Sequence, residues 1–116
     1  MSVAVSAHTY ELITELSQAL HVSAKQVGEL LDIHPRTLQR RQESGSLEEA
    51  ELLRAQMLDE TFKLATAAFH DAEKARTWLF SEITALEFQR PVDLLKTIRG
   101  YEHVKNLLGQ IIFGVY

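Results

Sequence analysis

The residues most able to carry chemistry in this sequence are its histidines, and their spacing gives none of them a catalytic or metal-binding partner. They are His8, His21, His34, His70 and His103. No two lie four residues apart, and none has the Glu-x-x-His spacing of a carboxylate metal site. The chain has no cysteine, which excludes thiol nucleophiles and cysteine ligands, and its five glycines form no phosphate-binding loop. We therefore predict that the chain is not an enzyme and has no cofactor or metal.

A cluster of arginines is the second group with possible chemistry. The chain as a whole has a formal net charge of −4, but the segment 22–46 carries +1. Its three arginines, Arg36, Arg40 and Arg41, fall within six residues. Such a cluster can contact phosphates, although a cluster this small is often only a solvated helix face.

These residues must be positioned by helices, because helical periodicity runs along the chain and no strand pattern is found. Ser23 and Gln26 have the spacing of a capping box, as do Ser46 and Glu49. Pro35 suits a first helical turn, and Gly45 suits a helix end. The helices expected are 9–20, a short one after Ser23, one from Pro35 to about Glu43, 47–69, 72–80, Pro91 to Leu95, and a last one from about Tyr101 to Ile112. Trp78 is expected to be buried with Ala75 and Leu79.

The segment around Gly28 has the pattern of a helix-turn-helix. A small residue stands where two helices would cross, with Ile33 after the turn and Leu38 in the second helix. If the second helix enters a major groove, Arg36, Thr37, Gln39 and Arg40 lie nearest the bases and phosphates, while Lys25 and Arg41 contact phosphate. The alternative is a helix-turn-helix used only for packing. Asp32 occupies the turn position where glycine is common.

The second half of the chain carries a set of motifs at close spacing. They are Trp78-Leu79, Ala85-Leu86, Arg90-Pro91, Asp93-Leu94-Leu95, Thr97 with Gly100, Val104, Leu108 and Phe113-Gly114. With this pattern the second half resembles the C-terminal domain of the Xre/MbcA/ParS family of type II antitoxins, and the helix-turn-helix half resembles the N-terminal domain of the same family. The stretch Glu87-Phe88-Gln89 departs from it, because relatives often have a glycine-containing turn there.

The resemblance implies an all-α, cytoplasmic protein with three parts. A helix-turn-helix domain over 1–46 is joined by a connecting helix, 47–69, to a toxin-binding domain, 70–116. The implied partners are a RES-domain toxin that consumes NAD or transfers ADP-ribose, operator DNA, and a second copy of the chain within a toxin–antitoxin hetero-oligomer. No apolar run approaches the ~20 residues of a membrane span. The alternative is a stand-alone helix-turn-helix transcriptional regulator.

The apolar last residues are the expected means of inhibition. Phe113, Gly114, Val115 and Tyr116 are expected past the last helix, with rings and a carboxylate suited to the mouth of an NAD site. Arg99, Gly100, Tyr101 and Lys105 are expected at its rim. The alternative is that the helical surface around Arg99 and Lys105 blocks the toxin, while the tail packs on its own core.

Overall fold

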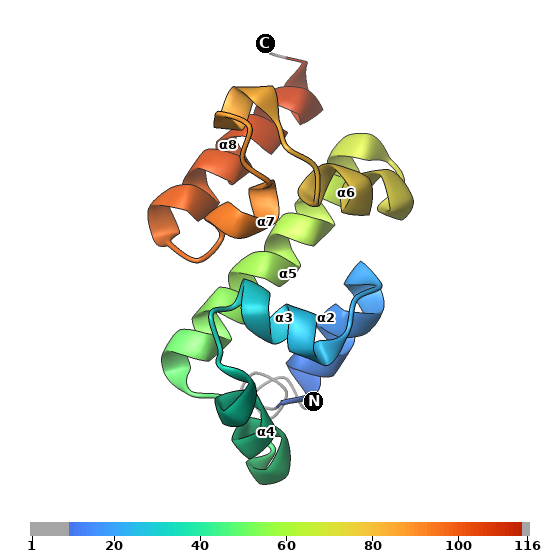
Figure 1. The fold of residues 1–116 in the computed structure, drawn as a ribbon. Helices are drawn as coiled ribbons and strands as arrows, with labels where there is room; N and C mark the ends of the chain where they lie inside the picture. Colours follow the sequence, from blue (N-terminus) through green and yellow to red (C-terminus); the bar gives the residue numbers. More distant parts are fainter. Residues whose placement is uncertain (1–9, 115–116) are drawn as a thin grey trace. The chain divides into compact units, whose positions relative to one another are not determined.

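The computed structural model describes residues 10–114, and its regular structure in that range is helical (Figure 1). The described residues form no strand, although an isolated bridge joins Ile83 and Gln89. In chain order the helices are α2 (Glu11–Leu20), α3 (Ala24–Leu30), α4 (Pro35–Ser44), α5 (Glu49–Phe69), α6 (Ala72–Leu79), the 3-10 turn η1 (Thr84–Leu86), α7 (Pro91–Leu94) and α8 (Ile98–Phe113). The all-α prediction is confirmed.

The chain divides into two compact units, and the division falls inside α5. The N-terminal unit is residues 1–56 and the C-terminal unit is residues 57–116. The helix predicted to connect two domains therefore contributes its first turns to one unit and its last turns to the other. The division into 1–46, 47–69 and 70–116 stays a prediction.

Local capping interactions set the helix limits of the N-terminal unit. Ser23 Oγ accepts from the Gln26 amide at 3.1 Å, and Gln26 Oε1 accepts from the Ser23 amide at 2.9 Å, so the predicted capping box is present. Before Pro35, the side chain of His34 caps α4 by accepting from the Arg36 amide at 3.1 Å. Gly45 ends α4 with a φ of 80°, a left-handed conformation that glycine adopts without steric cost.

The core of the N-terminal unit lies where α2, α3 and α4 meet. Its buried apolar residues are Ile13, Leu16, Leu20, Val27, Leu30, Leu31, Ile33, Leu38, Leu47, Leu52 and Ala55. Several of these match the helical spacing seen in the sequence, which is why the positions of the helices could be predicted.

In the C-terminal unit, α6, α7 and α8 each begin at a residue that the sequence marks. Asp71 Oδ1 accepts from the amides of Glu73 and Lys74, and Thr97 Oγ1 accepts from the amide of Gly100 at 3.0 Å. Arg90 precedes Pro91 and binds Asp93 through two contacts of 2.8 and 2.9 Å, which fixes the first turn of α7. The buried side chains between these helices include Ala75, Leu79, Leu86, Val92, Leu95, Val104 and Leu108.

Two predicted helix starts are wrong. α5 begins at Glu49 rather than at residue 47, because the Glu51 carboxylate accepts from the Glu48 amide at 2.9 Å, so the predicted Ser46 cap is not used. α8 begins at Ile98 rather than near Tyr101, so Gly100 lies inside its first turn. The helix also continues through Phe113, which was expected past its end.

Trp78 is only partly buried, contrary to the expectation from its place beside Leu79. Ala75 and Leu79 are fully covered, whereas the Trp78 ring lies on Phe69 with 5.7 Å between ring centroids. Both rings line a shallow surface hollow. A cost of 3–5 kcal/mol for Trp78→Ala, typical of a fully buried ring, is therefore not expected.

Candidate functional site

The helix-turn-helix of the N-terminal unit is formed by close packing at Gly28. A Cβ at Gly28 would meet Leu38 Cδ2 at 3.1 Å and the Ile33 carbonyl oxygen at 3.4 Å, so α3 and α4 approach each other closely there. The Ile33 amide donates to the Gly28 carbonyl at 2.7 Å and closes the turn. Asp32 adopts the left-handed conformation, with a φ of 61°, at the position where glycine is common. The predicted motif is present in three dimensions.

One side of α4 carries exposed polar groups and is defined here as the α4 face. It consists of Arg36, Gln39, Arg40 and Glu43, which lie at spacings of three, four and seven residues and line one shallow depression. Three of the four were predicted as DNA contacts. Glu43 was not, and its carboxylate would repel phosphate beside the two arginines.

Two further predicted contacts lie near this face or outside it. Thr37 is partly buried, and its hydroxyl oxygen accepts from Arg40 Nη2 at 3.4 Å, so it orients that arginine. Lys25 is exposed in the first turn of α3. Its ammonium group is free to reach a phosphate only if the nucleic acid extends beyond α4.

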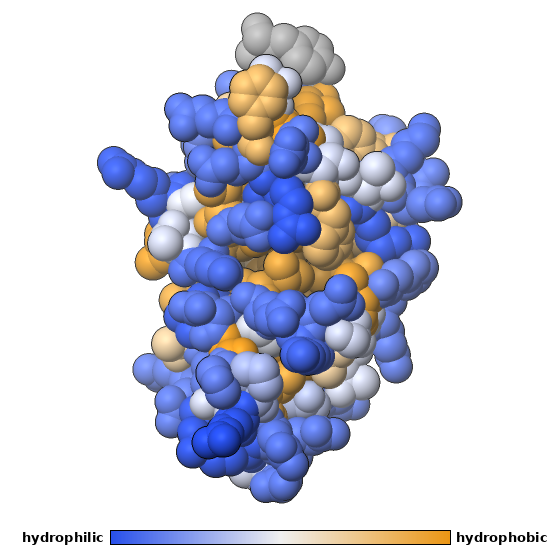
Figure 2. Space-filling view, viewed as in Figure 1, coloured by the Kyte–Doolittle hydropathy of each residue, from blue (hydrophilic) through white to orange (hydrophobic). Residues whose placement is uncertain are grey.

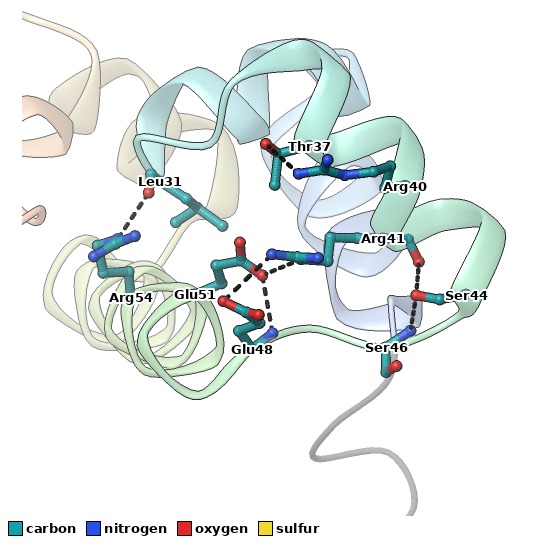
Figure 3. Close-up of polar contacts among 9 residues, drawn as sticks. All are labelled: Leu31, Thr37, Arg40, Arg41, Ser44, Ser46, Glu48, Glu51 and Arg54. Atoms are coloured by element: carbon teal, nitrogen blue, oxygen red, sulfur yellow. Dashed lines mark hydrogen bonds and ion pairs between the residues drawn. The ribbon is translucent and has the colours of Figure 1, made fainter.

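Arg41 was predicted to contact phosphate, but the structure places it inside the N-terminal unit (Figure 3). Its Nε lies 2.8 Å from Glu51 Oε1, and its Nη2 lies 3.4 Å from Glu48 Oε1. Burial alone would raise the pKa of Glu51, but hydrogen bonds from Arg41 and the Glu48 amide, with attraction to Arg41 and Arg54, hold that pKa below its ordinary value. Arg41 thus joins α4 to the first turn of α5.

A second arginine fixes the turn of the helix-turn-helix to α5. Arg54 Nε donates to the Leu31 carbonyl oxygen at 2.7 Å, and Leu31 directly follows α3 (Figure 3). That carbonyl is among those left without a helical partner at the end of a helix. Arg41 and Arg54 together join α4 and the turn after α3 to the first turns of α5.

The Arg41–Glu51 pair predicts an acid-sensitive contribution to stability. Because the pKa of Glu51 is lowered by folding, its contribution is present above the unfolded carboxyl pKa, about 4.3, and is lost as pH falls through the lower folded value. We expect Glu51→Gln to lower the melting temperature by several degrees at pH 7 and by less at pH 3, where the carboxylate is being protonated. Thermal melts across this range are the measurement. Glu49→Gln, which changes an exposed carboxylate in the same turn of α5, is the matched control. An equal difference at both pH values would contradict the assignment.

The end of α8 exposes apolar side chains, and Phe113 is the most exposed apolar residue among the described residues predicted to contact the toxin. Phe113 is 80% exposed and Ile112 is 40% exposed. Gly114 ends the helix with a φ of 67°, in the left-handed region. Figure 2 shows apolar residues, in orange, exposed on the part of the molecule where α8 ends in Figure 1. Val115 and Tyr116 lie outside the described residues.

Gly100, predicted at the rim of the toxin's NAD site, packs closely against the end of α7. A Cβ on Gly100 would overlap the carbonyl oxygen of Leu94 and stand 2.9 Å from its carbonyl carbon. The first turn of α8 therefore lies directly on the last residue of α7. The residue type is explained by this approach of two backbones, without any partner.

The three other predicted rim residues occupy the first two turns of α8. Arg99 is exposed. Tyr101 is partly buried, its hydroxyl lies 3.4 Å from Glu60 Oε1, and Lys105 Nζ lies 5.0 Å from the centre of its ring. With Glu60 and Leu64 of α5, Tyr101 and Lys105 line a second shallow depression. The structure brings these two residues together, at the opposite end of α8 from Phe113.

No arrangement that could hold a metal occurs within residues 10–114, where no three His, Asp or Glu side chains converge. The same part of the chain contains no helix long and apolar enough to cross a membrane.

Two family models match, and together they cover most of the chain. Residues 6–58 match the antitoxin Xre-like helix-turn-helix domain, and residues 64–114 match the antitoxin Xre/MbcA/ParS C-terminal toxin-binding domain. The chain belongs to the Xre/MbcA/ParS family of antitoxins. A chain of the crystal structure of the M. tuberculosis MbcT–MbcA toxin–antitoxin complex shares the fold of this antitoxin, with a TM-score of 0.65 and 20% identity over 92% of this chain and 96% of that one. No curated protein matches the antitoxin significantly.

Sequence reasoning missed two exposed apolar residues of the antitoxin's C-terminal unit. Ile98 is 61% exposed in the first turn of α8, and Phe88 is 65% exposed in the turn after η1. Neither follows from helical periodicity, since Ile98 and Phe88 both lie between the ranges expected to be helical. The sequence did contain a signal for them, because both are large apolar residues that lie outside the buried face of any predicted helix.

Proposed function

We propose that this antitoxin neutralises a RES-type toxin that consumes NAD or transfers ADP-ribose, by covering the toxin's NAD site with the end of α8. The observation that carries the proposal is the exposure of Phe113, 80%, at the end of a helix that lies in the match to a toxin-binding domain. A soluble monomer gains nothing from an aromatic ring held in water on a rigid helix, whereas a partner that buries it gains affinity. An NAD site offers apolar walls for flat rings, which a phenyl ring fits.

The antitoxin activity is tested by co-expression with the neighbouring open reading frame, as the candidate toxin gene. We expect the wild-type chain to restore growth and to keep the cellular NAD pool from falling. Phe113→Glu should weaken toxin binding by about tenfold or more, because it places a charge in an apolar contact, and should leave the melting temperature nearly unchanged since the side chain is exposed.

The matched control is Leu53→Glu, which changes another exposed apolar residue outside the toxin-binding match. Deleting Gly114 to Tyr116 extends the test to the last residues. A Phe113→Glu variant that folds and still restores growth would show that another surface blocks the toxin. A toxin that stops growth without lowering NAD or modifying a protein would contradict the RES assignment.

We also propose that the antitoxin represses its own operon through the α4 face. Arg36, Gln39 and Arg40 are exposed on the second helix of a helix-turn-helix, which is the helix that enters the major groove in DNA-binding members of this fold class. A homodimer within a toxin–antitoxin complex would present two such helices to two half-sites. Arg41 is left out of this face because Glu51 and Glu48 hold its guanidinium.

A further inference from the structure

The turn between η1 and α7 holds two consecutive non-glycine residues in a left-handed conformation. Glu87 has a φ of 57° and Phe88 a φ of 64°. Residues with a Cβ rarely adopt this region, because the Cβ approaches a backbone oxygen. The other non-glycine residues of this kind within residues 10–114 are His21, Asp32 and His70, and each stands singly at the end of a helix, where such a residue closes the last turn.

Backbone hydrogen bonds and one buried neighbour hold the strained turn in place. The Phe88 amide donates to the Ile83 carbonyl at 2.9 Å, the Glu87 amide to Thr84 at 3.0 Å, and the Gln89 amide to Leu86 at 3.1 Å. Leu86 is 1% exposed and fixes the turn to the core of the C-terminal unit. The left-handed conformation is therefore imposed by the surrounding structure, which is the usual condition for strain to persist.

In this strained conformation the turn exposes the aromatic side chain of Phe88 to solvent. The Phe88 ring is 65% exposed although it is one of the largest apolar side chains in the unit. Figure 1 draws this turn, in gold, toward the same end of the C-terminal unit as the last turn of α8, which carries Phe113. A glycine would form the turn at lower cost but would provide no side chain.

We propose that Phe88 is an anchor for the toxin: the strained turn inserts its ring into an apolar pocket on the toxin surface, beside the contact made by the end of α8. The toxin is the partner because the turn lies inside the match to a toxin-binding domain, residues 64–114. An exposed ring on a turn held by backbone hydrogen bonds suits a partner pocket, since little conformational entropy is lost when it binds. This inference rests on the proposed antitoxin function.

The test separates the ring from the strain. Phe88→Asn removes the ring and keeps a residue that tolerates the left-handed conformation, so we expect an unchanged or higher melting temperature with binding to the purified product of the adjacent toxin gene about tenfold weaker or more. Glu87→Gly relieves strain and keeps the ring, so it should melt higher and bind like wild type. Phe88→Tyr should retain most of the affinity.

Three outcomes would overturn the inference. If wild type binds the toxin and Phe88→Asn binds equally well, the ring is not a contact. If Phe88→Asn changes the sedimentation of the antitoxin alone and leaves toxin affinity unchanged, the ring contacts a second copy instead. If wild type itself does not bind, the proposed function is wrong and the contact falls with it.

Discussion

Gly100→Ala is expected to abolish the cooperative thermal unfolding of the C-terminal unit. The new methyl group would overlap the Leu94 carbonyl oxygen, and that obstacle is backbone rather than a movable side-chain end. Overpacking that neighbouring side chains can absorb costs about 1–3 kcal/mol, so a clash with backbone should exceed this range. Total stability is only about 5–15 kcal/mol for a domain, and a smaller unit lies low in that range. Thermal melts by circular dichroism and toxin neutralisation are the two measurements.

The same helix offers a matched control. Gly109 lies inside α8, and a Cβ there would have no atom within 4 Å. Gly109→Ala should therefore stabilise the chain by about 1 kcal/mol, the usual helix preference for alanine over glycine. A Gly100→Ala variant that melts like wild type would show that α8 can shift from α7 at little cost. Loss of neutralisation with a normal melt would restore Gly100 to the toxin-contact set.

The second large effect is expected on DNA binding. Replacing both Arg36 and Arg40 with alanine should weaken binding to the promoter segment upstream of the gene by about thirtyfold to several hundredfold, because each arginine contact to a base or phosphate contributes about 1–2 kcal/mol. Each lost phosphate contact should also reduce the salt dependence of the affinity by about 0.9 in log–log slope. Gel-shift titrations at several salt concentrations give both values, and toxin neutralisation should be unchanged.

Two comparisons make the result specific. Lys74→Ala with Lys96→Ala removes the same charge from the C-terminal unit, so it should leave promoter binding nearly intact. Glu43→Gln removes the carboxylate from the α4 face and should act in the opposite direction, raising the affinity. If the double arginine variant and the lysine control weaken binding equally, the contribution is general electrostatics and the α4 face is not the contact.

Features encoded by neighbouring residues could be predicted from the sequence. Ser23 with Gln26, Asp71 before α6 and Gly45 after α4 each act within a few residues, and each forms the cap that its spacing predicts. The pattern at Gly28 also predicted a close helix crossing, because a small residue between apolar positions has few other structural uses.

The features that were not predicted depend on contacts between different helices or on how much of a side chain the fold covers. Arg41 was assigned to DNA because its partner, Glu51, stands ten residues away in the next helix. Gly100 was placed before the last helix, whereas the structure puts it in the first turn of α8, against the backbone of Leu94. Trp78 was expected inside because aromatic residues usually are, whereas the fold leaves its ring half covered on Phe69. Periodicity assigns a residue to a helix face and does not show what covers that face.

The two arginine contacts to α5 also decide where this chain can be cut or fused. A fragment ending at residue 46 would leave Arg41 without Glu51, and the Leu31 carbonyl without Arg54. A fragment continuing to residue 58, where the helix-turn-helix match ends, keeps both contacts. Chimeras that exchange toxin specificity between relatives should therefore be joined in the middle of α5. The loop before α5 is the more obvious junction in the sequence. A junction there would separate the helix-turn-helix from Glu51 and Arg54, the α5 residues that contact it.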